Sequence, residues 1–201
     1  MTKEIIFVTS NKGKVASAQK YLEDANITLS HYELDIDEPN VNDIEFIATH
    51  KVKEAFIKIN KPCISLDEGF YIPNFPNNPN FPGAFPKREL INKMGIDGLL
   101  SEMKNVENRE CYFKQCLAYF DGSKLKLFHG YSYGNLATER RGNDLNKKWS
   151  ELWEVFIPQN CTKTLAEMTD EERYNRKDNR TSEFVEFSQW FKSQEDVMQK
   201  N

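Results

Sequence analysis

Residues 4–25 read EIIFVTSNKGKVASAQKYLEDA, and this stretch decides the fold class. Its four consecutive apolar residues, Ile5 to Val8, are typical of a short strand that is buried on both faces. Ser10 or Asn11 can cap a helix, and apolar residues then recur at helical spacing from Val15 onward. A buried strand, a polar loop and a helix in direct succession indicate an α/β fold.

The same alternation continues through the first third of the chain. Residues 27–34 predict a second strand, residues 44–59 an amphipathic helix and residues 62–67 a short third strand. Residues 71–86 carry prolines every three or four positions and predict an irregular loop. We expect the polar loops at the strand ends to carry the chemistry.

The second half predicts a hairpin followed by helices. Residues 110–120 and 123–133 flank Asp121-Gly122, a strong signal for a tight turn between two strands. An interrupted helix is expected from Lys87 onward, before this hairpin, and a short strand over 155–157 after it. Capping-box spacing and an aromatic helical face predict two closing helices; the residues concerned are Thr164, Thr169, Phe184, Phe187, Trp190 and Phe191.

Length and charge narrow the classes of function. The chain has 201 residues and a formal net charge of -4, so we expect one domain over 1–201 and no polymeric nucleic-acid partner. No apolar run is long enough for a signal peptide or a membrane span, which predicts a cytoplasmic protein. The four cysteines lack zinc-site spacing and predict reduced, mostly buried thiols.

The loop Thr9-Ser10-Asn11-Lys12-Gly13-Lys14 is the first candidate binding site. It lies between the first strand and its helix, where free helix amides and two lysines can hold a phosphate. The spacing of a Walker A loop is absent, and two lysines in a first turn can equally form a solvated surface.

Lys51 and a group of carboxylates form the second candidate. Lys51 falls on an otherwise apolar stripe of the helix over 44–59, where it either reaches water or points into a polar cleft. Carboxylates precede that helix and follow the third strand, at Asp35, Asp37, Glu38, Asp67 and Glu68. Such carboxylates are typical Mg²⁺ ligands, although acidic loops are often only solvated.

Two further groups could contact a nucleotide. Trp149 and Trp153 lie next to a polar loop and could stack on a base, and the polar run Asp178-Asn179-Arg180 could hydrogen-bond a ring or a phosphate. Core packing and helix capping are the alternative readings of these residues.

Taken together, these motifs resemble the inosine triphosphate pyrophosphatase family. Residues 7–14 look like its T-G-N-x-x-K, Ala48 to Lys51 its A-x-x-K, and residues 65–70 its acidic pair. The remaining landmarks follow in the family's order: P-G-x-Y at 82–85, R-G at 141–142, F-x-P at 156–158, T-x-A-E-M at 164–168 and S-H-R at 178–180.

The resemblance implies an enzyme that hydrolyses non-standard purine nucleoside triphosphates such as ITP, dITP and XTP to the monophosphate and pyrophosphate. The family fold is an elongated, mixed α/β sheet flanked by helices and split into two lobes around a nucleotide cleft, usually in a homodimer. Its cofactor is Mg²⁺.

The resemblance also implies roles for individual residues. Thr9, Ser10, Asn11 and Lys14 would contact the triphosphate, and Lys51 would neutralise phosphate charge. Asp67 would be the carboxylate that orders metal and water, with Lys14 and Lys51 as its catalytic partners. Glu38 would be the second metal ligand, with Asp37 as the alternative. On the base side, the expected contacts are Trp149, Trp153, Asp178, Asn179 and Arg180.

Several positions depart from the family pattern. Ser10 replaces a glycine, Leu66 the first acid of the pair, and Asn179 a histidine. The aromatic-Asp-Pro step before F-x-P reads Leu152-Trp153-Glu154, so its aspartate is missing or replaced by Glu151 or Glu154. These departures leave two alternatives open: a nucleotide-binding relative that has lost catalysis, and a pyrophosphatase for another modified nucleotide.

Overall fold

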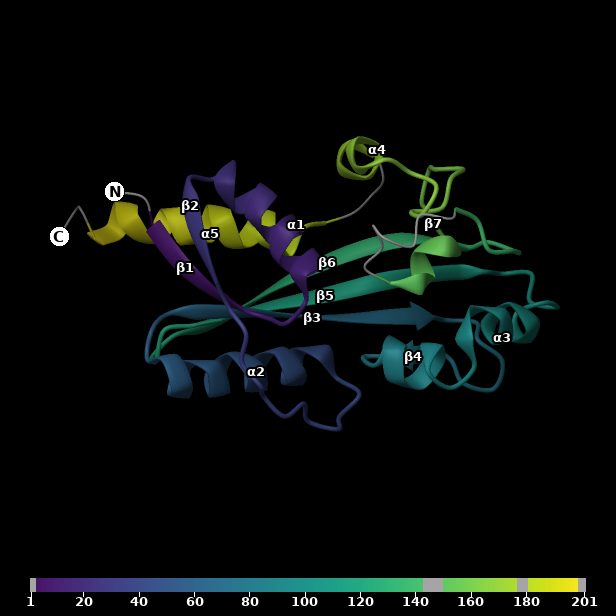
Figure 1. The fold of residues 1–201 in the computed structure, drawn as a ribbon, viewed down its shortest axis with the longest axis horizontal. Coiled ribbons are helices and arrows are strands. Elements are labelled where there is room, and N and C mark those ends of the chain that lie inside the picture. The colour runs from purple at the N-terminus through teal and green to yellow at the C-terminus, as the bar shows by residue number, and fades with distance from the viewer. Residues whose placement is uncertain (1–2, 143–149, 177–180, 199–201) are drawn as a thin grey trace. The chain divides into compact units, whose positions relative to one another are not determined.

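A computed structural model describes residues 3–142, 150–176 and 181–198 of the chain (Figure 1). Its helices and strands are, in order, β1 (Lys3–Val8), α1 (Lys12–Glu23), β2 (Ile27–Tyr32), α2 (Ile44–Ile59), β3 (Cys63–Ile72), β4 (Phe81–Gly83), η1 (Pro86–Ile91), α3 (Gly95–Glu102), β5 (Glu110–Phe120), β6 (Leu125–Leu136), η3 (Glu151–Glu154), β7 (Phe156–Pro158), α4 (Asp170–Asn175) and α5 (Glu183–Met198).

The strands form one mixed seven-stranded sheet. Its order is β2-β1-β3-β5-β6-β7, with β4 paired to β3 off this path. β1 runs parallel to both β2 and β3, whereas β3 with β4 and β6 with β7 are antiparallel pairs. The expected mixed α/β class with an open sheet flanked by helices is therefore confirmed.

The chain divides into two compact units. Unit 1 comprises residues 1–67, 115–130 and 182–201, and unit 2 comprises residues 68–114 and 131–181. Three strands change unit along their length: β3 after Asp67, β5 after Lys114 and β6 after Gly130.

In unit 1, helices lie on both faces of the strands, with α1 and α5 on one face and α2 on the other (Figure 1). Successive side chains of β3 point alternately to these two faces. Ile64 and Leu66 join the core under α1 and α5, whereas Cys63 and Ser65 bond to carbonyls of α2. The next residue on the α2 side is Asp67.

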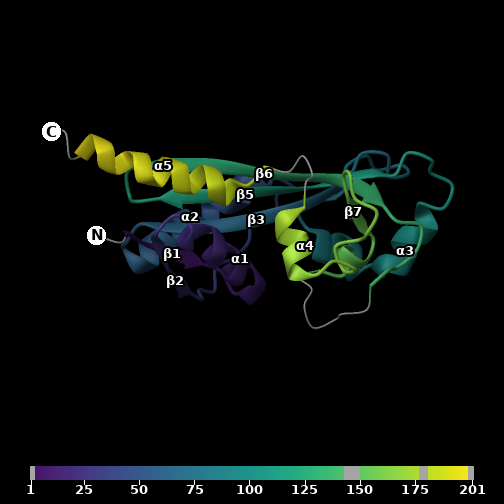
Figure 2. The same cartoon turned by 90° about the horizontal axis from the view of Figure 1, so that it is seen from above.

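Aromatic rings fill the core on the α5 side of unit 1. α5 packs along β5 and β6 within this unit, as Figure 2 shows. The ring of Phe187 lies 5.5 Å from that of Phe128 and 5.1 Å from that of Phe191, measured between centroids. The expected aromatic helical face is present, and it buries Phe184 and Phe187 almost completely.

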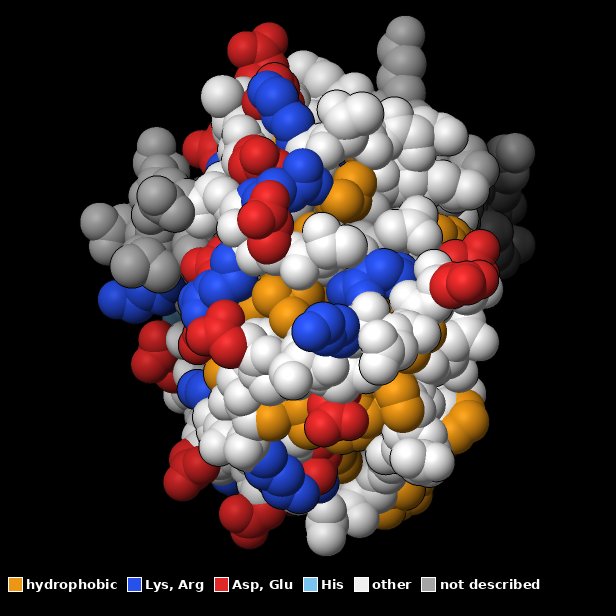
Figure 3. Space-filling model, turned by 90° about the vertical axis from the view of Figure 1, so that its right-hand side faces the viewer, with side chains coloured by type: hydrophobic (Ala, Val, Ile, Leu, Met, Phe, Trp, Pro, Cys, Tyr) orange, Lys and Arg blue, Asp and Glu red, His pale blue; other side chains and the backbone are white. Residues whose placement is uncertain are grey.

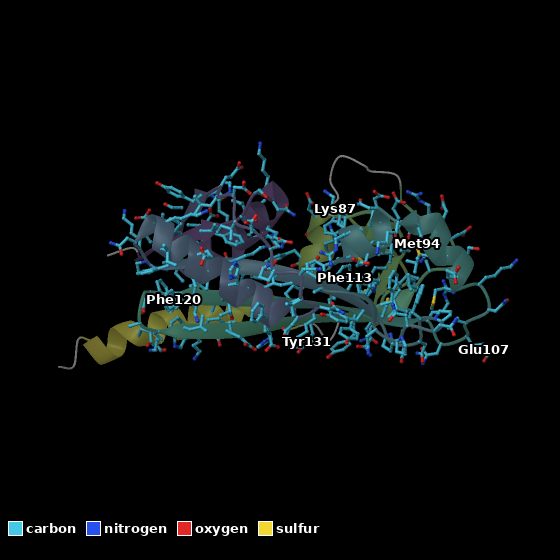
Figure 4. The ribbon with its side chains drawn as sticks, turned by 90° about the horizontal axis from the view of Figure 1, so that it is seen from below. Lys87, Met94, Glu107, Phe113, Phe120 and Tyr131 are labelled. Carbon is cyan, nitrogen blue, oxygen red and sulfur yellow. The ribbon has the colours of Figure 1, made fainter. Side chains whose placement is uncertain are left out.

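Unit 2 has its own apolar core. Phe70, Phe113 and Phe156 from three strands contact one another at its centre, with centroid distances of 4.7 to 6.2 Å. Leu90 of η1 and Leu99 of α3 belong to the same buried cluster, and Met94 packs against it. Figure 4 labels Phe113 and Met94 within this unit.

The segment over 71–86 differs from its prediction. It is not wholly irregular, because Phe81–Gly83 pairs with β3, which itself continues to Ile72 rather than ending near 67. The helix expected from Lys87 begins as the π-helical turn η1 and resumes as α3 at Gly95. Gly95 has a φ of 67°, which explains the interruption there.

The two capping boxes have different outcomes. The Thr169 box is complete and starts α4, as predicted. At Thr164 the side chain of Glu167 accepts from the Thr164 amide at 2.7 Å, but the segment forms turns and no helix. Its amides instead bond outward, from Leu165 to the carbonyl of Phe156 and from Ala166 to that of Trp153, so this box does not start a helix. The two predicted closing helices are α4 and α5.

The cysteines are mostly buried thiols, as predicted, and the surface mixes charged and hydrophobic side chains (Figure 3). On the face drawn in Figure 3, acidic and basic side chains are interspersed and hydrophobic ones lie between them. None of the described helices is long and apolar enough to cross a membrane. None of the four cysteines forms a disulfide, and three of them are buried.

Candidate functional site

Asp67 is the carboxylate around which the candidate site forms. It is 8% exposed and belongs to the side of β3 that faces α2. Its Oδ1 atom is bonded, whereas its Oδ2 atom is buried with no hydrogen-bond partner among the described residues. A buried carboxylate oxygen without a partner is costly, and a cation or a water can satisfy it.

Lys51 points at this carboxylate from α2. Its Nζ atom lies 2.7 Å from Asp67 Oδ1 and also bonds Glu38 Oε1. Burial by itself would lower the pKa of Lys51, but the nearby Asp67 and Glu38 outweigh burial and raise it. Lys51 is therefore a fixed cation at neutral pH, directed into a polar site rather than out to water.

Glu38, and not Asp37, makes the contact with Lys51. Both acids lie in the segment before α2, and the side chain of Glu38 is half-exposed where it meets the lysine. The last turn of α2 holds this segment, because Lys58 Nζ donates to the carbonyl of Asp35 at 2.6 Å. Lys51 thus links Glu38 to Asp67, because its ammonium contacts both carboxylates. That these two carboxylates bind a metal stays a prediction.

The loop over 9–14 is ordered by its own side chains. Asn11 caps α1, since its Oδ1 atom accepts from the amides of Gly13 at 2.9 Å and Lys14 at 3.2 Å. The Asn11 amide in turn donates to Thr9 Oγ1 at 3.1 Å. These helix amides are therefore already satisfied, so phosphate binding here falls to the side chains of the loop.

Lys14 connects this loop to β3. Its Nζ atom donates to the carbonyl oxygen of Leu66 at 2.9 Å. Lys51 bonds the next residue, Asp67, so the ammonium groups of α1 and α2 reach two consecutive residues of one strand. Within unit 1, Lys51 thus bonds the predicted catalytic carboxylate, and Lys14 bonds the backbone of the residue before it.

Sequence reasoning missed His31. Its Nε2 atom lies 2.6 Å from the carbonyl oxygen of Thr9, and the Thr9 amide donates to the carbonyl of Tyr32. The end of β2 therefore holds the start of the loop. The only possible signal was the parallel register of β1 with β2, which a single sequence does not reveal.

The donor set is compatible with a magnesium ion. No group of three or more His, Cys, Asp or Glu side chains that could hold a metal occurs in the described part of the chain. Mg²⁺ does not need one, because it usually keeps several waters and takes one or two carboxylates plus substrate phosphates. Asp67 and Glu38 supply two carboxylates, and Asp67 Oδ2 is unpartnered among those residues.

In unit 2, Trp153 and Glu154 are both engaged in contacts. Glu154 is 4% exposed and its carboxylate is bonded by Arg140, which also lies 3.5 Å from Asp97. The guanidinium of Arg173 lies over the Trp153 ring at 5.0 Å. Glu154 is therefore the partner of Arg140, and one face of Trp153 is covered by a cation.

The remaining predicted base contacts lie outside the described residues. They are Trp149, Asp178, Asn179 and Arg180. Ser10 is described and exposed, between the bonded residues Thr9 and Asn11. The structure thus brings together Asn11, Lys14, Lys51, Glu38 and Asp67 in unit 1, whereas Trp153 is the one predicted base contact that lies within the described residues.

Comparison with known proteins decides the family. The model of the Ham1 family matches residues 5–190. The chain is a member of the Ham1 family. Among its Ham1 relatives, the dITP/XTP pyrophosphatase of Thermococcus kodakarensis is 31% identical over 188 residues, covering 94% of this chain and 97% of the relative. The enzyme of the same name from Methanosarcina acetivorans is also 31% identical, with 94% and 98% covered. The resemblance carried by the sequence motifs is confirmed.

Solved Ham1 structures share the fold. The Ham1 protein of Staphylococcus aureus superposes with a TM-score of 0.74 at 19% identity, covering 96% of this chain and all of the other. A HAM1 protein of Coxiella burnetii gives 0.76 at 21% identity, with 95% and 99% covered. These likenesses support the fold alone.

Proposed function

We propose that this Ham1 protein is a nucleoside triphosphate pyrophosphatase that hydrolyses non-standard purine nucleotides of the ITP, dITP and XTP class. Its relatives named dITP/XTP pyrophosphatase support the substrate class. The observation that carries the proposal is the convergence of Lys14 and Lys51 on Leu66 and Asp67 of β3. Two lysine side chains at Leu66 and the buried Asp67 suit a polyphosphate and an attacking water.

In the proposed reaction, Lys14 and Lys51 neutralise the triphosphate and hold it at the end of β1. Asp67 orients a water molecule and accepts a proton from it. The oxygen of that water attacks the α-phosphorus. The bond from the α-phosphorus to the bridging oxygen breaks, and pyrophosphate leaves with the electron pair. The products are the nucleoside monophosphate and pyrophosphate.

Glu38 and Asp67 are the residues that we propose to hold Mg²⁺. When bound, the ion supplies Lewis-acid polarisation of the phosphoryl oxygens and offsets the charge that develops on pyrophosphate. The Asp67 Oδ2 atom, which has no hydrogen-bond partner among the described residues, supports this assignment. Thr9, Ser10 and Asn11 would complete the contacts to phosphate from the loop.

On the base side we propose Trp149, Trp153, Asp178, Asn179 and Arg180. Asparagine offers both a donor and an acceptor, so Asn179 can pair with a 6-keto purine in place of the family histidine. The pairing of the buried Glu154 carboxylate with the partly exposed Arg140 favours a second candidate, a pyrophosphatase for another modified nucleotide. In that case the acidic residue that the family carries before F-x-P is replaced by Glu154, which forms a structural ion pair with Arg140 instead of contacting the base.

We also propose that the whole chain acts as one catalytic domain, because β3, β5 and β6 each contribute to both compact units. A cytoplasmic homodimer is the proposed form. The nucleotide pool on which such an enzyme acts supports the location, and the family resemblance supports the dimer.

The direct test is a panel of triphosphates. Purified protein is incubated with Mg²⁺ and ITP, XTP, dITP, ATP or GTP, with and without EDTA, and the products are separated by chromatography. Release of IMP or XMP with pyrophosphate, lost with EDTA and in Asp67→Asn, is the expected result. Glu107→Gln changes an exposed carboxylate in unit 2 (Figure 4) and serves as the matched control with unchanged turnover.

Three outcomes would count against this proposal. Full turnover in Asp67→Asn would remove Asp67 from the reaction. Binding of the nucleotides without hydrolysis of any would instead support the relative that has lost catalysis, and hydrolysis of only another modified nucleotide would support the second candidate.

A further inference from the structure

Lys51 occupies the position between the two carboxylates that the proposed function assigns to a metal. Its ammonium bonds Glu38 Oε1 and Asp67 Oδ1 at the same time. The lysine side chain is 20% exposed and that of Asp67 is 11% exposed, so the pair is largely shielded from water. The site therefore already contains a cation, and that cation belongs to the protein.

An ammonium and a divalent ion compete for such oxygens. Each carboxylate oxygen bonded to Nζ is sterically and electrostatically less available to a metal, and like charges a few Å apart repel strongly in a poorly solvated site. Asp67 Oδ2 is the exception, because it is buried and bonds nothing among the described residues. The carboxylate thus has one oxygen bound by the lysine and one still to be satisfied.

We propose that Lys51 is a resident counter-ion which competes with metal for Glu38 and Asp67 and is released from them when a metal–triphosphate complex enters. The inference rests on the proposed function. Without nucleotide, Lys51 keeps the carboxylates paired and free metal binds weakly.

The triphosphate makes the release of Lys51 favourable. Phosphate oxygens offer the ammonium new anionic partners close to those it leaves, while the freed carboxylate oxygens turn to the metal. Binding of metal and binding of nucleotide are then linked, each increasing the affinity for the other. Lys14 takes no part in this exchange, since its Nζ atom bonds the carbonyl of Leu66 rather than a carboxylate.

The test is Mn²⁺ binding to the intact protein in the absence of nucleotide, measured by the loss of the free-ion EPR signal. Lys51→Met removes the charge and keeps the length of the side chain, and Lys51→Gln serves as a second variant. We expect either variant to bind Mn²⁺ about tenfold or more tightly than the wild type, because the competing cation has gone. Circular dichroism verifies that each variant is folded.

Lys14→Met is the matched control. It also removes one lysine charge next to β3, but it frees no carboxylate oxygen. We expect it to change Mn²⁺ affinity much less than Lys51→Met does. An equal gain in both variants would overturn the inference, because the effect would then be one of net charge alone.

The remaining outcomes separate this inference from the proposed function. If Asp67→Asn abolishes Mn²⁺ binding but folded Lys51→Met and Lys51→Gln bind no more tightly than the wild type, the metal site stands and the competition by Lys51 is wrong. If Asp67→Asn and Glu38→Gln leave Mn²⁺ binding unchanged in the wild type and in Lys51→Met, the proposed metal site itself is wrong. If Lys51→Met binds Mn²⁺ more tightly than the wild type and adding Asp67→Asn reverses this gain in affinity, the metal site and the competition by Lys51 are both supported.

Discussion

Lys51 Nζ lies 2.7 Å from Asp67 Oδ1, and this contact joins the middle of α2 to the point where β3 leaves unit 1. The alternation of β3 turns Asp67 toward α2, and the helical stripe turns Lys51 toward β3. A lysine that looks misplaced in an apolar stripe is therefore explained by a carboxylate sixteen residues later.

The two carboxylates near Lys51 should not contribute equally. Asp67 is buried and has an unpartnered oxygen among the described residues, whereas the side chain of Glu38 is 51% exposed. We expect Asp67→Asn to lower kcat by about 100-fold or more, as loss of an acid–base group does, and Glu38→Gln to lower it less. Steady-state pyrophosphate release measures both, and a larger loss in Glu38→Gln would reverse the assignment.

His31 should matter through the loop that it holds. His31→Gln keeps a donor for the carbonyl of Thr9, whereas His31→Leu removes it. We expect His31→Leu to raise KM for the triphosphate by about three- to tenfold, the equivalent of one hydrogen bond, with kcat less affected and His31→Gln near the wild type.

The control for His31 lies one residue earlier on the same strand. Ser30→Ala also removes a hydrogen bond from β2 to β1, between Ser30 Oγ and Glu4, but on the other face of the strand. It should leave KM unchanged. Equal effects of Ser30→Ala and His31→Leu would indicate general loosening of the strand pair rather than positioning of the loop.

Arg109 should be a stability residue of unit 2. Its guanidinium donates to the carbonyls of Leu136 at 2.9 Å, Ala137 at 2.8 Å and Met103, and so ties the residue before β5 to the end of β6 and to the C-cap of α3. Lysine cannot reproduce this fork. We expect Arg109→Lys to lower the free energy of unfolding by about 1.5–3 kcal/mol, measured by urea denaturation. Arg88→Lys, at an exposed position, should cost far less.

The thiols give a prediction that depends on pH. Burial raises the pKa of Cys63 to about 12 and that of Cys111 well above its usual value. Because only the thiolate reacts, about one Cys63 in ten thousand is reactive at pH 8, and the fraction grows as pH rises. We expect about one fast-reacting thiol with DTNB at pH 8, that of the partly exposed Cys161, and four after denaturation. Two or more fast thiols in the native protein would contradict this.

Much of unit 1 was predictable from the sequence because its signals are local. The buried run before Ser10, the stripe over 44–59 and the placement of Lys51 within it each rest on residues close in the chain. For the same reason the sequence narrowed the helix cap to Ser10 or Asn11, and the structure shows that it is Asn11.

What the sequence could not supply depends on contacts between distant segments. His31 meets Thr9 only through the register of β1 with β2, and Lys14 of α1 meets the carbonyl of Leu66, which lies 52 residues later on β3. The capping box at Thr164 has the right spacing, yet its amides bond to Trp153 and Phe156 instead of starting a helix. In each case tertiary hydrogen bonds override the local pattern.

The most direct test of the central claim is hydrolysis of ITP with Mg²⁺ in water enriched in ¹⁸O, followed by mass spectrometry of the products. Attack of water on the α-phosphorus at the Lys14, Lys51 and Asp67 site predicts one ¹⁸O atom in IMP and none in pyrophosphate. Label in pyrophosphate, or release of inorganic phosphate with IDP, would place the attack on another phosphorus and contradict the account.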